Sequence, residues 1–135
     1  MQKIFSFLVI GLVLMRTSIY AGGDAEDQLL NTNPYVNFNL NNAWLEKADL
    51  RKADLSGAKL YRANMEYVDL IGANLNGADL SNVRLRGTNL TNAILDNAIL
   101  HYTNLGGVNL SRASLKSAKL RDAGFSNRKT DDIRF

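Results

Sequence analysis

A large apolar residue stands at every fifth position through most of this 135-residue chain. The series is unbroken from position 40 to position 125, and its eighteen members are all Leu except Met65 and Phe125. Two positions before each member the residue is usually Ala, and the residue between them is usually Asp or Asn. A repeat this long determines the fold, so its period has to be explained before any local motif.

A period of five fits neither an α-helix nor a flat strand. Five residues of α-helix turn the chain through about 500°, so successive leucines would be spread around the axis. In a flat strand side chains alternate, so every second leucine would face water. The chain must therefore bend after every five residues, with Leu and Ala directed inward and the intervening Asp or Asn directed outward.

The two remaining residues of each unit form the bend. They are rich in turn-forming residues, as in Ser56-Gly57, Asn76-Gly77 and Gly106-Gly107. Four right-angle bends close a square coil of 20 residues, and successive coils stack by parallel strand pairing at about 4.8 Å. We therefore predict an all-β fold, a quadrilateral parallel β-helix of about 4.5 coils over residues 38–127.

The run Ala-Asp-Leu-Arg-Lys-Ala-Asp-Leu-Ser-Gly at 48–57 is similar to the pentapeptide-repeat family. The resemblance covers about two thirds of the chain and implies that the β-helix is a right-handed solenoid. The usual right-handedness of parallel crossovers agrees with it. Because leucine fills the interior of such a column and leaves no cleft, we do not expect an enzyme, and we expect no cofactor.

Residues 1–21 have the order of a secretory signal peptide. Lys3 precedes an apolar run from Ile4 to Met15, and the small residues Ala21 and Gly22 follow further along the chain. A membrane-spanning helix needs about 20 apolar residues. This run has only twelve. We therefore expect cleavage after Ala21 and export to the periplasm or the medium, with membrane attachment only if the segment stays uncleaved.

Charge and cysteine content exclude several classes of function. Without residues 1–21 the chain has fourteen Lys and Arg against thirteen Asp and Glu, a net charge of +1. So small a charge does not favour nucleic acid as a partner. The chain has no Cys, which excludes disulfides, thiolate metal sites, a cysteine nucleophile and lipid attachment at cysteine.

Both ends of a stacked column expose unpaired strand edges and need a cap. We accordingly divide the mature chain into an N-terminal cap at 22–37, the repeats at 38–127 and a C-terminal tail at 128–135. At the C-terminal end, Phe125, Ile133 and Phe135 either fold back as a plug or meet a second copy. Some pentapeptide-repeat proteins dimerise through this end, so the resemblance implies a homodimer as a hypothesis.

Residues 20 apart stack on one face, so the surface can be sketched from the sequence. One face has more aromatic and basic residues than the others, and interfaces favour Tyr and Arg. Ile94, on the adjacent face, would form an exposed apolar ridge with Ile99 and Tyr102. The alternative is a solvated face without a partner. The candidate interaction face comprises Lys59, Tyr61, Arg62, Ile94, Ile99, His101, Tyr102, Lys119 and Arg121.

Isolated polar residues do not form a catalytic or metal site. His101 is the only His, and no nucleophile or second ligand accompanies it, so we expect an ordinary surface histidine. A column of outward residues resembles a cation ladder, but half of it is amide, so we favour a structural role. Its members are Asp49, Asp69, Asn89 and Asn109.

Three other residues depart from the repeat. Thr88 and Thr103 take inward positions, and we expect their hydroxyls to bond to carbonyls of the neighbouring coil, because an unpaired buried hydroxyl costs about 1–3 kcal/mol. Trp44 takes an outward position, and we expect it to pack under the N-terminal cap.

These observations predict a rigid, exported, non-enzymatic scaffold that binds a protein partner of unknown identity. The alternative is topoisomerase protection, because certain pentapeptide-repeat proteins resemble a DNA duplex and occupy the DNA-binding site of gyrase. This chain departs from that group in its signal peptide, its lack of net negative charge and its short column.

Overall fold

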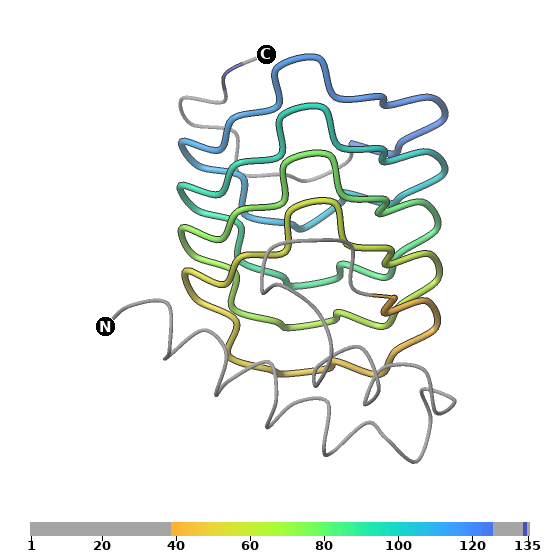
Figure 1. Cartoon of the computed structure of the whole chain (residues 1–135), viewed down its shortest axis with the longest axis vertical. Coiled ribbons are helices and arrows are strands. Elements are labelled where there is room, and N and C mark those ends of the chain that lie inside the picture. Colours follow the sequence, from red (N-terminus) through yellow and green to blue (C-terminus); the bar gives the residue numbers. More distant parts are fainter. Residues whose placement is uncertain (1–38, 126–133, 135) are drawn as a thin grey trace.

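The computed structural model describes residues 39–125 and Arg134. These residues form one column of stacked coils that rises in sequence order (Figure 1). Every bridge between coils is parallel and joins residues 20 apart, from Asn39 with Lys59 to Ser114 with Arg134. The predicted bend after every five residues and the square coil of 20 are confirmed.

The column has four faces, each built from single bridge residues. The described residues contain no helix and no longer strand, because a two-residue turn follows each bridge segment. Each bridge is closed by backbone hydrogen bonds, as where Leu60 N donates to Asp79 O at 2.8 Å and Asp79 N donates to Ala58 O at 2.9 Å. Face 1 contains residues 39, 59, 79, 99 and 119; face 2 contains 44, 64, 84, 104 and 124; face 3 contains 49, 69, 89 and 109; face 4 contains 54, 74, 94, 114 and 134.

Each corner is a tight turn whose second residue has a positive φ. In the first described corner Ala43 N donates to Leu40 O at 3.1 Å, and Asn42 has φ 59°. A bond over three residues with a left-handed second residue is the geometry of a type II turn. Corner 1 lies between faces 1 and 2, corner 2 between faces 2 and 3, corner 3 between faces 3 and 4, and corner 4 between faces 4 and 1.

The outward Asp and Asn residues hold these corners. Asp79 Oδ1, for example, accepts a hydrogen bond from Ser81 N, two residues later, at 3.0 Å. Lys59 cannot accept such a bond, and there Tyr61 N donates instead to Asn41 Oδ1 in the preceding coil at 2.9 Å. A short polar side chain at the outward position therefore has a structural role, which explains its prevalence in the repeat.

The core is the stack of inward residues. The fifth-position series from position 40 to position 115 is at most 3 % exposed, and the small inward residues lie between its members. The Oγ1 atoms of Thr88 and Thr103 donate to the carbonyls of Met65 and Leu80, each at 2.7 Å. The predicted bonding of both hydroxyls to the neighbouring coil is therefore confirmed.

Several predictions fall outside the described residues. They are the signal peptide at 1–21, the cap at 22–37, and the plug or contact made by Ile133 and Phe135. Arg134 is described, and it lies in the column, because its N donates to Ala113 O and its O accepts from Leu115 N. Among residues 39–125 we find no helix that is long and apolar enough to cross a membrane.

Candidate protein-binding surface

The 20-residue register brings most of the predicted interaction residues together on face 1 and corner 1. Lys59, Ile99 and Lys119 are members of face 1, with Asp79 between the first two. The residues of corner 1 follow directly after these in each coil; they include Tyr61, Arg62, His101, Tyr102 and Arg121.

The proposed apolar ridge is interrupted. Ile94 lies on face 4 and is exposed, whereas Ile99 lies on face 1 and is half-buried. Corner 4 separates them, and there Asn97 is exposed and donates from Nδ2 to Asn76 Oδ1 at 3.1 Å. A polar corner therefore divides the two isoleucines.

Arginine and tyrosine side chains are stacked at the two corners that border face 2. At corner 1 the Arg62 guanidinium lies 5.1 Å from the centre of the Tyr61 ring, and Arg121 lies 5.5 Å from Tyr102. At corner 2 Arg86 lies 6.0 Å from the ring of Tyr67. These distances are in the range of cation–π contacts.

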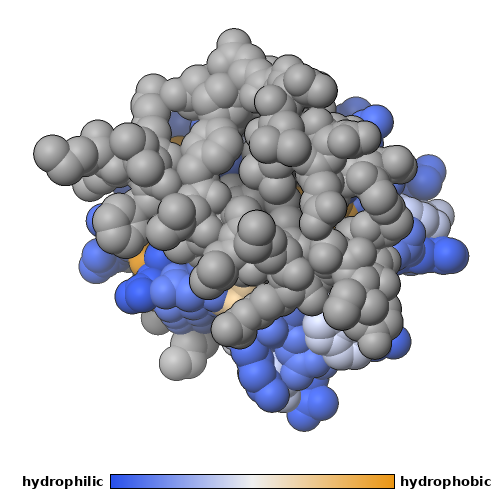
Figure 2. Space-filling model, turned by 60° about the horizontal axis from the view of Figure 1, so that its bottom comes forward, coloured by the Kyte–Doolittle hydropathy of each residue, from blue (hydrophilic) through white to orange (hydrophobic). Residues whose placement is uncertain are grey.

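Face 2 itself carries further exposed residues that the sequence analysis did not select. Arg84 is exposed on it, and Trp44 is 55 % exposed at its lower end. The packing of Trp44 under a cap stays a prediction, because the cap residues 22–37 lie outside the described residues. The described surface seen from the residue-39 end is mainly hydrophilic, with small scattered apolar areas (Figure 2). Among the described residues four large apolar or aromatic side chains are exposed, and three of them, Trp44, Tyr67 and Tyr102, lie on face 2 or its corners.

His101 has a buried Nδ1 atom with no hydrogen-bond partner. The residue lies in corner 1, above Ser81 and below Arg121 in the register. Neither neighbour is a metal ligand of the kind that would complete a site. Within 39–125, no three His, Asp or Glu side chains gather where they could hold a metal ion.

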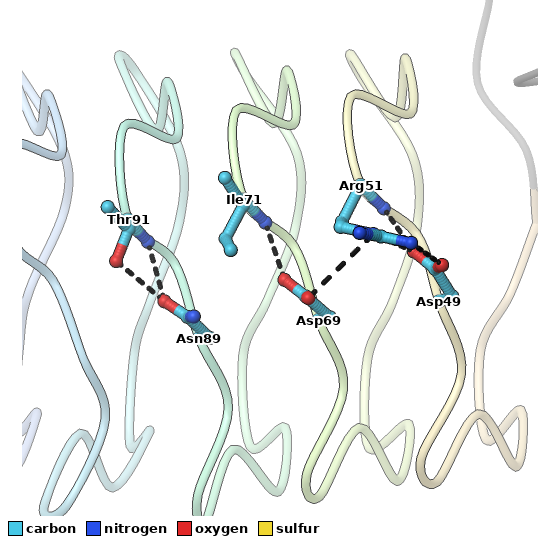
Figure 3. A network of polar contacts seen from close by, with 6 residues as sticks. All are labelled: Asp49, Arg51, Asp69, Ile71, Asn89 and Thr91. Carbon is cyan, nitrogen blue, oxygen red and sulfur yellow. Dashed lines mark hydrogen bonds and ion pairs between the residues drawn. The ribbon is translucent and has the colours of Figure 1, made fainter.

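The column of Asp and Asn on face 3 is engaged in internal contacts (Figure 3). The Arg51 guanidinium donates two hydrogen bonds to Asp49, from Nη2 to Oδ2 and from Nε to Oδ1, the latter at 2.8 Å. Arg51 Nε also lies 3.9 Å from Oδ2 of Asp69. Each outward oxygen accepts from the backbone N two residues later, as Asn89 does from Thr91 at 3.1 Å. These contacts support the structural role over a cation ladder.

Arg51 also perturbs the titration of its partner. Its hydrogen bond to Asp49 lowers the pKa of that carboxyl, and the same contact raises the pKa of Arg51. Both side chains are more than half exposed, so the pair is screened by solvent.

At the last described coil, Phe125 is partly buried and packs against the core together with Leu120. This side chain belongs to the end of the hydrophobic column. Its two predicted companions, Ile133 and Phe135, lie outside the described residues.

A square column of parallel coils with a filled core and stacked polar faces defines a β-solenoid. The chain belongs to the pentapeptide-repeat family, whose model, "Pentapeptide repeats (8 copies)", matches residues 37–70, 63–101 and 93–127. The predicted right-handed quadrilateral β-helix is thereby confirmed.

The solved structures that are similar to this chain include two with a TM-score above 0.5. QnrB1, a plasmid-mediated fluoroquinolone resistance protein, is 23 % identical with a TM-score of 0.67, over 72 % of this chain and 46 % of that one. The pentapeptide repeat protein alr5209 from Nostoc PCC 7120 is 37 % identical with a TM-score of 0.55, over 56 % of this chain and 62 % of that one. This chain therefore spans about half to three fifths of their lengths. No curated protein matches it.

Proposed function

We propose that this protein is a non-enzymatic, exported scaffold that binds another protein through the flat faces of its column. The observation that carries the proposal is the stacking of exposed Arg side chains on Tyr rings, on a backbone that is hydrogen-bonded from coil to coil. A surface held in this way loses little conformational freedom on binding. The filled leucine interior supports a role without catalysis.

Export is the part of the proposal that rests on residues 1–21. Cell fractionation combined with the intact mass of the recovered chain tests it. We expect a product that begins at Gly22 in the periplasm or the medium. An intact chain recovered from the cytoplasm would contradict export.

Topoisomerase protection is the alternative function. The likeness to QnrB1 is one of fold, at 23 % identity. Residues 39–125 carry eleven Lys and Arg against eight Asp and Glu, a net charge of +3, which does not favour imitation of DNA. A gyrase supercoiling assay with a fluoroquinolone discriminates the two functions. We expect no protection by the purified chain, and protection at stoichiometric concentration would support the alternative.

The homodimer through the C-terminal end is a separate proposal about assembly. It rests on the partial burial of Phe125 at the last described coil. Sedimentation equilibrium of the mature chain tests it, and we expect twice the mass of one chain. The mass of a single chain would contradict it.

A further inference from the structure

Three arginines on face 2 and its corners form no ion pair with another described residue. Arg62, Arg84 and Arg86 are all exposed. The ion pairs within residues 39–125 involve other cations, namely Lys47 with Glu46, Arg51 with Asp49 and Asp69, and Arg121 with Asp122. Within residues 39–125, the charges of these three side chains are therefore not neutralised by an ion pair.

The three arginines form a short row across face 2. Arg84 is the bridge residue one coil above Asn64, and Arg86 follows it in corner 2 of the same coil. Arg62 lies in corner 1 at the opposite border, about one coil spacing of 4.8 Å lower. Trp44 lies below this row, Tyr67 lies in the coil of Arg62 at the opposite corner, and Tyr102 lies above the row, so aromatic side chains flank the charges. We call these six residues the arginine surface.

Two of the three guanidinium groups are held in place by rings. Arg62 lies over Tyr61 and Arg86 over Tyr67. A guanidinium stacked on a ring keeps its N–H donors free in its own plane, where they match the two oxygens of a carboxylate. Because part of the side-chain freedom is already lost, pairing with a carboxylate orders these groups at a smaller entropic cost.

The composition of this surface favours a protein over a nucleic acid. A nucleic-acid strand has a phosphate charge about every 3.4 Å and binds a densely basic surface. Here Glu66 occupies corner 2 directly below Arg86, and Glu46 lies below Glu66. Few and separated carboxylates fit this pattern better than a continuous row of phosphates. Trp, Tyr and Arg are also the residues that carry most of the binding energy at protein interfaces.

We propose that the arginine surface is the docking site for an acidic segment of a partner protein, whose Asp or Glu side chains pair with Arg62, Arg84 and Arg86. This inference rests on the proposed scaffold function and specifies the face and the chemistry of its partner.

In-cell photo-crosslinking tests the face. A photoreactive phenylalanine replaces Tyr102 on the arginine surface or Ile94 on face 4; both positions are exposed, and they lie eight residues apart in the chain. We expect the probe at Tyr102 to capture a protein segment rich in Asp and Glu, and Arg84→Glu to remove that product. Capture at Ile94 alone would overturn the docking site and leave the scaffold function intact. Capture from neither position would contradict both, and capture of nucleic acid would overturn the choice of partner.

A synthetic peptide with the captured sequence tests the chemistry. Trp44 is the only Trp in the chain, so its fluorescence reports binding to the full mature protein directly. We expect Arg62→Gln to weaken binding about fivefold, a change typical of one lost charge-assisted pair. Arg112→Gln is the matched control, because Arg112 is also exposed and has the same φ of 58° in corner 3. An equal effect of both substitutions, or undiminished binding of a peptide with Gln and Asn in place of Glu and Asp, would overturn the proposal.

Discussion

The ring of Tyr67 lies directly against the α-carbon of Gly87, the residue stacked above it in corner 2. A β-carbon at position 87 would approach Cδ1 of the ring to 2.5 Å. Gly87 also has φ +69°, so both its backbone conformation and its neighbour favour the absence of a side chain. The ring is thereby held where Arg86 stacks on it.

We expect Gly87→Ala to destabilise the column more than Gly77→Ala does. Gly77 has φ +68°, but a β-carbon added there would meet no atom within 4 Å, so its substitution adds only backbone strain, about 1–2 kcal/mol. Gly87→Ala also displaces the Tyr67 ring, which adds about 1 kcal/mol. Urea unfolding of both variants measures the difference. Equal losses would show that the ring moves aside at no cost, and Tyr67→Ala should abolish the difference.

A second prediction concerns the buried hydroxyl of Thr103. Its bond to Leu80 O is 2.7 Å long and fully buried. Val fits the same kind of position, as Val83 and Val108 do, so Thr103→Val removes the hydrogen bond with little change of shape. We expect a loss of about 1 kcal/mol in the free energy of unfolding. An unchanged or higher stability would mean that the hydroxyl does not contribute.

A third prediction concerns Asp96, which replaces a missing acceptor. Ser114 stands at the outward position where most five-residue units have Asp or Asn, and Lys116 N donates instead to Asp96 Oδ1, in the preceding coil, at 3.0 Å. Ser114 Oγ donates to the same oxygen. We expect Asp96→Ala to cost about 1–2 kcal/mol and Asp96→Asn to cost less, because Asn keeps the acceptor. Thermal unfolding of the two variants tests this, and equal losses would indicate a role of charge alone.

A fourth prediction concerns pH. Because the Arg51 hydrogen bond lowers the pKa of Asp49 in the folded state, the pair stabilises the fold above the unfolded pKa. That contribution is lost as pH falls through the folded pKa, which lies below 3.8. We expect an NMR titration to place the Asp49 midpoint below 3.8, and Arg51→Gln to raise it. A midpoint unaffected by Arg51→Gln would contradict the assignment.

The fold was predictable because the repeated residues are the ones that form the core. Only a bend after each unit lets Leu and Ala face inward together, and the stacking of residues 20 apart follows from closure of the coil. Lys59 has no acceptor for the N–H of Tyr61, and Asn41 of the preceding coil supplies one instead. This contact was not predictable. It depends on the direction of a corner side chain, which a periodic pattern does not specify.

The surface was predictable only in part. Columns of residues can be read from the sequence; they grouped Tyr61, Arg62 and Tyr102 on one face, and the structure describes these three as residues of corner 1. Arg84, Arg86 and Trp44 were missed because the columns were assessed one face at a time. The arginine surface extends over face 2 and both of its corners. Its extent is apparent only from the stacking contacts at the two corners and from the exposure of the side chains between them.

The five-residue unit and the 20-residue coil have different consequences for how such a chain can change. Loss of a whole coil would shorten the column and keep each remaining column of outward residues in line. Loss of a single five-residue unit would also keep every leucine inward, but it would rotate all later outward residues by a quarter turn. That rotation leaves the packing of the core unchanged, whereas it changes which outward residues are stacked together on each face. Short insertions and deletions can therefore generate new recognition surfaces in this architecture without a new fold.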